Sequence, residues 1–346
     1  MNSGQLLRVD YLTPDELTES RARGWRDVLG IALFSVDETP LDAADVPLAR
    51  VATRPLGGQP VLGEVWRAEG PFETGTVGLV HFRSNGQCVF GCVTLPEGTV
   101  GAADDGATLR SITKRAYAAV FDCLAALRLP HAVRIWNYLP RINRTAGGIE
   151  RYLQFNEARQ RAFRSSSRSI RGDVPAACAL GSVAGNSLVV YFLATATAGM
   201  PIENPRQLAA YDYPPEYGAF SPTFSRATLA QAAGNPVLFV SGTASIVGHR
   251  TLHAGDVGAQ ARETAGNIRA LVAEANRIAG EQLFAPERLG YKAYVRHPGD
   301  VESVVRELDQ AIHPARPVVC LNADVCRADL LVEIEAVGFG RERREL

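Results

Sequence analysis

The chain has 346 residues, of which 46% are hydrophobic, so it can form two domains or one large domain with well-buried cores. A net charge of −1 and the lack of a dense basic run exclude charge-driven binding to nucleic acid or an anionic membrane. No apolar run of about 18 residues occurs, and the first residues lack a signal-peptide pattern. We therefore expect a cytoplasmic protein with neither nucleic acid nor membrane as a partner.

Hydrophobic periodicity predicts two series of elements. The first comprises strands at 77–84 and 87–95, a helix at 109–129, a strand at 131–139, a helix at 147–163, and strands at 176–184 and 187–196. The second comprises a strand at 236–248, a helix at 257–280, a strand at 291–297, a helix at 300–312, and strands at 317–325 and 329–338. The intervening segment is rich in Pro, Tyr and Gly, which indicates an ordered loop covering a pocket or a seam.

The two series share one order of parts, which predicts an internal duplication. Pro175 and Cys178 recur as Pro317 and Cys320, 142 positions later in both cases. The predicted fold class is α+β, with two β-α-β-α-β halves packed in one chain. We assign residues 1–200 to a degenerate N-terminal half, 201–235 to an ordered linker, and 236–346 to the C-terminal half.

Two glutamates, Glu333 and Glu335, share one face of the strand predicted at 329–338. Under the duplication they align with Tyr191 and Leu193, so the fold requires an acid at neither position. The comparison favours a functional role for Glu333. For Glu335 we favour a salt-bridged structural residue; the alternative is a partner that raises the pKa of Glu333 or orients an arginine.

The six cysteines include no C-x-x-C pair and are expected to be buried, reduced thiols. Cys326 departs from this pattern, because it lies in a polar break where a partly exposed thiol is expected. His249 and His253 form H-x-x-x-H in a Gly-containing loop without an obvious third ligand, so we expect no metal site. Ser241 lacks the G-x-S-x-G elbow of a serine hydrolase.

The second half resembles the RidA (YjgF/UK114) family. The resemblance rests on "SGTAS" (241–245), the spacing of Gln260 and Asn267, "PARPVV" (314–319) and "VEIEA" (332–336). It implies hydrolysis of enamines or imines, with Arg316 at the place of the arginine that holds the substrate carboxylate.

Nearly the whole chain resembles a narrower group, the chorismatase family. The motifs, in order, are "RIWNYLPRIN" (134–143), "RYLQFNEARQRAF" (151–163), "YPPEYGAFSPTFSRA" (213–227), "SGTASIVGH" (241–249) with "HAGDVGAQARET" (253–264), "YVRHPGD" (294–300) and "DVCRADLLVEIEA" (324–336). The resemblance implies two YjgF/RidA-like (chorismate-mutase-like) halves. It also implies cleavage of the enolpyruvyl ether of chorismate to pyruvate. Acid catalysis of this cleavage would require no metal or organic cofactor.

Site residues follow from the resemblance and from the chemistry of the substrate. The family's general acid falls on Glu333, and burial could raise the pKa of that carboxyl enough to keep it protonated. Gly242 and Cys326 match a pair implied for the branch that forms 3-hydroxybenzoate; a dihydrodiol or mixed 3- and 4-hydroxybenzoate remain alternatives. A dianionic substrate needs cations and hydroxyl donors. The candidates within the motifs are Tyr138, Arg141, Tyr152, Arg159, Tyr213, Arg226 and Arg296.

Two hypotheses from other classes stay open. One is a RidA-like deaminase acting on enamine or imine acids, and the other is a small-molecule-binding protein without catalysis. The resemblance leaves the assembly open between a monomer and a trimer-like form.

Overall fold

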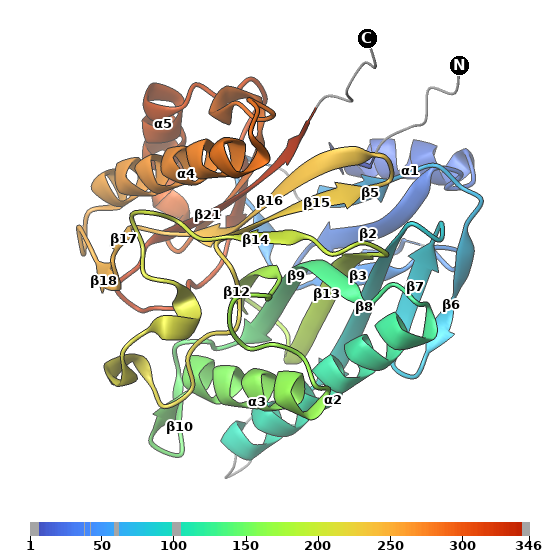
Figure 1. The fold of residues 1–346 in the computed structure, drawn as a ribbon, viewed down its shortest axis with the longest axis horizontal. Coiled ribbons are helices and arrows are strands. Elements are labelled where there is room, and N and C mark those ends of the chain that lie inside the picture. The colour runs from blue at the N-terminus through green and yellow to red at the C-terminus, as the bar shows by residue number, and fades with distance from the viewer. Residues whose placement is uncertain (1–6, 38, 42, 59–61, 99–104, 341–346) are drawn as a thin grey trace.

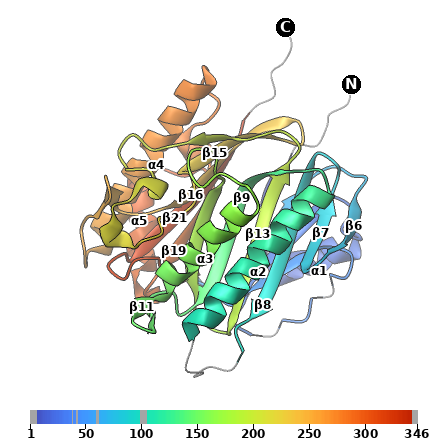
Figure 2. The same cartoon turned by 60° about the horizontal axis from the view of Figure 1, so that its bottom comes forward.

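The computed structural model describes residues 7–37, 39–41, 43–58, 62–98 and 105–340. Three large sheets surround a shared apolar core, and helices cover their outer faces (Figure 1, Figure 2). In the described part of the chain, no helix is long and apolar enough to cross a membrane.

The first sheet is formed by the N-terminal segment in the order β1-β5-β2-β3. Its elements are β1 (Arg8–Leu12), α1 (Pro14–Ala22), β2 (Val28–Phe34), β3 (Leu48–Val51) and β5 (Leu62–Arg67). Helix α1 begins at a capping box, in which Thr13 and Glu16 each bond to the other's backbone. One face of this sheet packs under α1, and the other contributes to the shared core.

The second sheet has the order β12-β9-β13-β8-β7-β6, and two helices pack on its outer face. Its elements are β6 (Glu73–Val77), β7 (Val80–Ser84), β8 (Cys88–Pro96), α2 (Asp105–Ala126), β9 (His131–Pro140), α3 (Arg151–Ser165), β12 (Ala176–Ser182) and β13 (Ser187–Thr195). A short hairpin precedes α3, formed by β10 (Thr145–Ala146) and β11 (Ile149–Glu150).

The third sheet has the order β14-β15-β16-β21-β19-β20-β4, also with two helices outside it. Its elements are β4 (Arg54–Pro55), β14 (Met200–Ile202), β15 (Ala227–Ala232), β16 (Asn235–Thr243), α4 (Val257–Ala279), β19 (Gly290–Val295), α5 (Val301–Ala311), β20 (Val319–Asn322) and β21 (Val332–Phe339). Smaller elements are η1 (Ala210–Asp212), η2 (Pro215–Tyr217), β17 (Ile246–Val247), β18 (Arg250–Thr251), η3 (Pro286–Arg288) and η4 (Pro298–Asp300). Helix α4 starts where the Asp256 side chain accepts a hydrogen bond from Ala259 N and stops at Gly280, whose φ is 74°.

The topology confirms the α+β class and the two repeated halves. The second sheet contains β12-β9-β13-β8 and the third contains β20-β19-β21-β16, with the same parallel and antiparallel pairings. β13, which carries Tyr191, and β21, which carries Glu333, hold the same central place in these two arrangements, as the predicted equivalence of the two residues requires.

The ungapped superposition of the two halves is wrong by one residue at the cysteines. Cys178 pairs with Trp136 and faces the shared core, whereas Cys320 pairs with Ala293 and faces the helices. A shift of one residue reverses the face of a strand, so the two thiols have different surroundings. The division at residues 200 and 235 stays a prediction. Within 201–235, β15 pairs with β16 and so belongs to the third sheet.

Candidate active site

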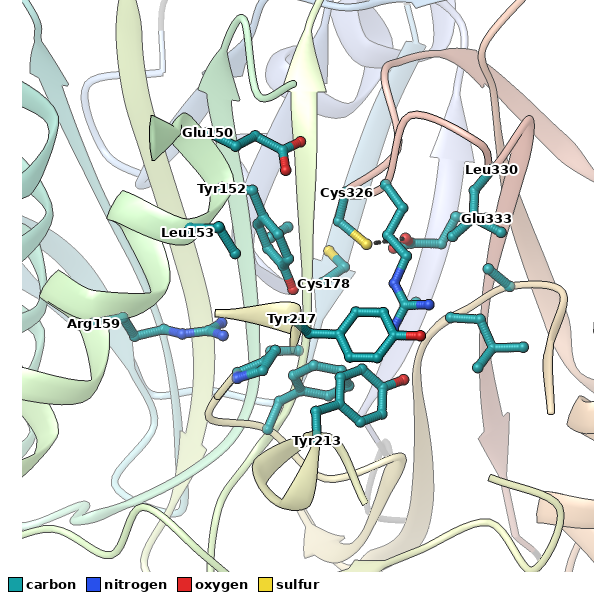
Figure 3. Close-up of a pocket in the computed structure, with 18 of the residues that line it drawn as sticks. Glu150, Tyr152, Leu153, Arg159, Cys178, Tyr213, Tyr217, Cys326, Leu330 and Glu333 are labelled. Atoms are coloured by element: carbon teal, nitrogen blue, oxygen red, sulfur yellow. Dashed lines mark hydrogen bonds between the residues drawn. The ribbon is translucent and has the colours of Figure 1, made fainter. Parts of the chain in front are cut away.

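A cavity that is partly open to solvent lies where the second and third sheets meet, at β12, β16 and β21 (Figure 3). Its volume is about 180 Å³. An engineered cavity of about 150 Å³ admits benzene, so this one can admit a six-membered ring. The lining residues are Glu150, Tyr152, Leu153, Arg159, Ala177, Cys178, Ala179, Tyr213, Glu216, Tyr217, Pro222, Phe224, Arg226, Gly242, Ala244, Ile246, Cys326, Arg327, Leu330 and Glu333.

Glu333 extends from β21 into this cavity and is only 4% exposed. Among the described residues, it forms no ion pair. Burial raises the pKa of Glu333 to about 8, and the charge of Glu335 adds to the rise, while Arg134 and Arg226 act against it. The carboxyl is therefore protonated at neutral pH and can donate a proton.

Gly242 has no side chain, and this leaves room for the Glu333 carboxyl. The pairing of β16 with β21 shifts register between Val240 and Thr243, and this irregularity contains Gly242. A Cβ atom at Gly242 would lie 1.8 Å from Glu333 Oε1 and 3.1 Å from Cys178 Cβ. Any larger residue must therefore displace the carboxyl or the strand.

The Cys326 thiol is next to the acid. Its Sγ atom lies 4.0 Å from Glu333 Oε2, and Tyr152 lines the same wall of the cavity. Burial raises the pKa of Cys326 to about 12, and Glu333 adds to the rise. The thiol is therefore neutral and can act as a weak donor to the carboxyl, not as a thiolate nucleophile.

Three arginines line the cavity, each with a buried nitrogen that has no hydrogen-bond partner among the described residues. These atoms are Arg159 Nε, Arg226 Nε and Arg327 Nη2. Arg159 donates to Asn156 Oδ1 at 2.8 Å, and Arg226 donates to the Tyr213 hydroxyl at 2.8 Å. Buried, incompletely paired guanidinium groups leave donors and positive charge for an anionic ligand.

Arg327 is a site residue that the sequence reasoning missed. It donates to His249 O at 2.9 Å, and its guanidinium carbon lies 4.2 Å from the Tyr217 ring centre and 5.1 Å from that of Tyr213. Its position next to Cys326 within "DVCRADLLVEIEA" was the available signal. The ring contacts connect the segment with η1 and η2 to the cavity, and Tyr213 and Tyr217 of this segment are among the residues that line it (Figure 3).

Of the predicted site residues, Glu333, Cys326, Gly242, Tyr152, Arg159, Tyr213 and Arg226 line this one cavity. The prediction is corrected for Tyr138, Arg141 and Arg296, which do not line it. Tyr138 shares a 2.7 Å hydrogen bond with Tyr294 in the core, and Arg141 donates to Glu97 and Asn186, each at 2.9 Å.

Arg296 and Arg316 also lie apart from the cavity. Arg296 donates to Asp324 Oδ1 at 2.5 Å and to the carbonyls of Val325 and Arg327, so it fixes the loop before β21. Arg316 is exposed and lines a groove beside α5, on the outer side of the third sheet. The arginine implied by the RidA resemblance is therefore not placed to hold a ligand in the cavity.

Glu335 is salt-bridged, as favoured from the sequence. It accepts from Arg134 Nη2 at 2.6 Å, Lys292 Nζ at 2.8 Å and Trp136 Nε1 at 2.9 Å. Burial alone would raise the pKa of Glu335, but Lys292, Arg134 and these hydrogen bonds outweigh burial and lower it. Glu335 is therefore ionised where Glu333 is protonated.

His249 contacts Tyr217, a residue of the cavity wall. Its Nδ1 atom lies 3.2 Å from the Tyr217 hydroxyl. Among the described residues, no group of three His, Cys, Asp or Glu side chains could hold a metal ion.

The fold and the cavity define a class: a two-repeat α+β protein with a cationic, largely enclosed small-molecule site around a protonated carboxyl. Residues 64–194 match the family profile described as chorismatase FkbO/Hyg5-like, N-terminal. A chorismatase of Streptomyces rapamycinicus is 34% identical over 94% of this chain and 97% of its own length. A 3-hydroxybenzoate synthase of Streptomyces hygroscopicus is 34% identical over 90% of this chain and 92% of its own. A crystal structure of a chorismatase superposes with a TM-score of 0.84 at 28% identity, covering 97% of this chain and 99% of the other. The chain belongs to the chorismatase family.

Proposed function

We propose that the protein is a chorismatase that cleaves the enolpyruvyl ether of chorismate, releasing pyruvate and forming 3-hydroxybenzoate. The observation that carries the proposal is Glu333, a buried carboxyl that keeps its proton near neutral pH and faces a cavity with three incompletely paired arginines. Relatives named chorismatase and 3-hydroxybenzoate synthase align over nine-tenths of the chain or more, which supports the same assignment.

Arg159, Arg226 and Arg327 supply the charge that a dianionic substrate requires. Two carboxylates can each accept from a guanidinium group, and Tyr213 and Tyr217 line the cavity beside them. The surrounding wall is largely apolar, which strengthens these charged interactions relative to water.

Glu333 starts the reaction by protonating the methylene carbon of the enol ether. The electron pair of the carbon–carbon double bond takes the proton, an oxocarbenium centre forms at the ether carbon, and Glu333 becomes a carboxylate. Arg226 and Arg134 oppose the rise in its pKa, so they also stabilise the carboxylate that the transfer produces.

The product depends on the fate of the oxocarbenium centre. Pyruvic acid and 3-hydroxybenzoic acid together have the composition of chorismic acid, so this branch needs no net water, whereas the dihydrodiol branch consumes one. Gly242 lets the Glu333 carboxyl approach the strand closely, and the neutral Cys326 thiol occupies space beside it. This close packing around the acid excludes water and favours aromatisation over hydrolysis.

The experiment is incubation of the purified protein with chorismate. A coupled lactate dehydrogenase assay follows pyruvate, and chromatography separates 3-hydroxybenzoate, 4-hydroxybenzoate and the dihydrodiol. We expect pyruvate and 3-hydroxybenzoate in equal amounts. Absence of pyruvate would refute the proposal, and ammonia release from an enamine or imine acid would support the RidA-like hypothesis instead.

A further inference from the structure

Glu335 belongs to a buried charged cluster at the junction of all three large sheets. Its Oε2 atom accepts from Arg134 of β9 at 2.6 Å and from the Tyr294 hydroxyl of β19 at 3.2 Å. Its Oε1 atom accepts from Trp136 Nε1 at 2.9 Å and pairs with Lys292 Nζ at 2.8 Å. Each of these side chains is nearly inaccessible to solvent.

A second carboxylate balances the charge of this cluster. Glu64 of β5 accepts from Lys292 and, at 2.9 Å, from Trp66 Nε1, so two anions face two cations. Replacing a buried ion pair by apolar residues is often neutral or stabilising, so stability alone does not account for such a cluster. The position of Glu333, two residues before Glu335 on the same strand, suggests another role for the cluster.

The geometry connects the cluster to the acid. Glu333 and Glu335 are successive residues on one face of β21, about 7 Å apart along the strand. We propose that Glu335 is a positioning residue: Lys292, Arg134 and Trp136 fix its negative charge beside Glu333, and that charge acts together with burial to hold the proton on Glu333 until it is transferred. The catalytic meaning of this inference rests on the proposed function.

The other groups that face Glu333 do not supply this effect. Arg134 and Arg226 both lower the pKa of Glu333, so they act in the opposite direction. Burial raises the pKa of Cys326 to about 12 and that of Cys178 well above its usual value, and both thiols are therefore neutral. The Tyr152 hydroxyl is neutral because burial raises its pKa as well. Glu150 and Glu216 also line the cavity, but Glu335 is the carboxylate whose charge adds to burial in raising the pKa of Glu333.

The test compares Glu335→Gln with Glu64→Gln, which removes the other carboxylate of the same cluster. The titration of Glu333 is followed by carboxyl carbon-13 NMR of glutamate-labelled protein, with Glu333→Gln assigning the resonance. In parallel, the rate of pyruvate release is measured from pH 6 to pH 10. The NMR titration does not depend on turnover, so it stands even if chorismate is not cleaved.

We expect Glu335→Gln to lower the Glu333 midpoint by about one pH unit or more and to move the alkaline fall in activity equally, since a general acid works only while protonated. Glu64→Gln should leave both within about 0.3 unit, well under the shift expected from loss of an adjacent charge. An unmoved midpoint in Glu335→Gln, or equal shifts in both variants, would overturn the inference.

Glu335→Asp is a second variant, in case Glu335→Gln does not fold. It keeps a carboxylate for Lys292 and Arg134 to bind, so the Glu333 midpoint should stay closer to that of the wild type than in Glu335→Gln. If Glu335→Gln does not fold, Trp136→Phe removes one hydrogen bond to Glu335 without changing any charge, and a raised Glu333 midpoint in that variant would contradict the inference. Absence of pyruvate from the wild type alone refutes the proposed function and not this inference.

Discussion

Glu333 and Glu335 lie on the same strand and face, yet they occupy opposite electrostatic environments. Glu333 has no ion-pair partner in the part of the chain that the structure describes, borders a cavity and has a raised pKa, whereas Glu335 is bound by two cations and an indole and has a lowered pKa. Burial is almost equal, at 4% and 6% exposed, so burial does not separate them. The difference is the ion pairing: cations hold Glu335 as a charge, whereas Glu333, which borders the cavity, retains its proton near neutral pH.

The largest effect is expected for Glu333→Gln. Removing a general acid costs about 10² to 10⁴-fold in turnover, so pyruvate release should fall by that range. Glutamine keeps the shape of the side chain, so the circular dichroism spectrum should stay that of the wild type. Normal turnover in this variant would show that Glu333 is not the proton donor.

The same variant tests the raised pKa of Glu333 through the pH dependence of protein stability. The ordinary value is 4.5 and the folded value is about 8, so the wild type loses stability as pH rises between them. Glutamine does not titrate, and the fall in melting temperature from pH 5 to pH 9 should be smaller in Glu333→Gln. Parallel curves for both proteins would contradict the raised pKa.

Gly242→Ala should have the next largest effect. The new methyl group would overlap Glu333 Oε1, so the carboxyl must move away from its present position. We expect 3-hydroxybenzoate formation to fall about 100-fold, an estimate based on misplacement of a catalytic group by about 1 Å, with any residual product shifted toward the dihydrodiol. Gly299→Ala is the matched control, because a Cβ atom there meets nothing within 4 Å. Unchanged product formation in Gly242→Ala would contradict the steric role.

Arg327→Ala tests the positive charge that the cavity beside Glu333 offers to a substrate carboxylate. A hydrogen bond to a charged group contributes about 1.5 to 3 kcal/mol, so kcat/KM should fall about 10 to 100-fold. Arg316→Ala is the control: it removes an exposed arginine outside the cavity, and its kcat/KM should equal that of the wild type. Equal losses in both would indicate a general effect of positive charge.

Cys326→Ala should change the product more than the rate. Removing the thiol leaves space beside Glu333 in which a water molecule can bind. We expect total pyruvate release within about threefold of the wild type, as befits a weak donor, and a larger share of dihydrodiol. Chromatography of the products measures this share, and an unchanged ratio would refute the assignment of Cys326 to the product branch.

The sequence predicted the repeated elements from local pattern, and it singled out Glu333 because the two halves could be compared strand by strand. Comparison of two equivalent strands isolated Glu333, since Tyr191 fills the same position in the other half. Arg327 was missed because an arginine in a polar break resembles a solvated residue. Its contacts with Tyr213 and Tyr217 depend on a segment more than a hundred positions earlier, and they appear only once the chain has folded.

Tyr138→Phe should have the smallest effect, and it tests where the sequence reasoning failed. Alternation along β9 gave Tyr138 a definite face, but which sheet would close over that face depends on tertiary packing. Its hydroxyl bonds to that of Tyr294, which in turn lies 3.2 Å from Glu335 Oε2, so it belongs to the paired cluster and not to the cavity. Phenylalanine should lower the free energy of unfolding by about 1 kcal/mol and leave the KM for chorismate unchanged. A raised KM with unchanged stability would indicate that Tyr138 contacts the substrate. The cavity at Glu333 and the charged cluster at Glu335 would then not be separate sites.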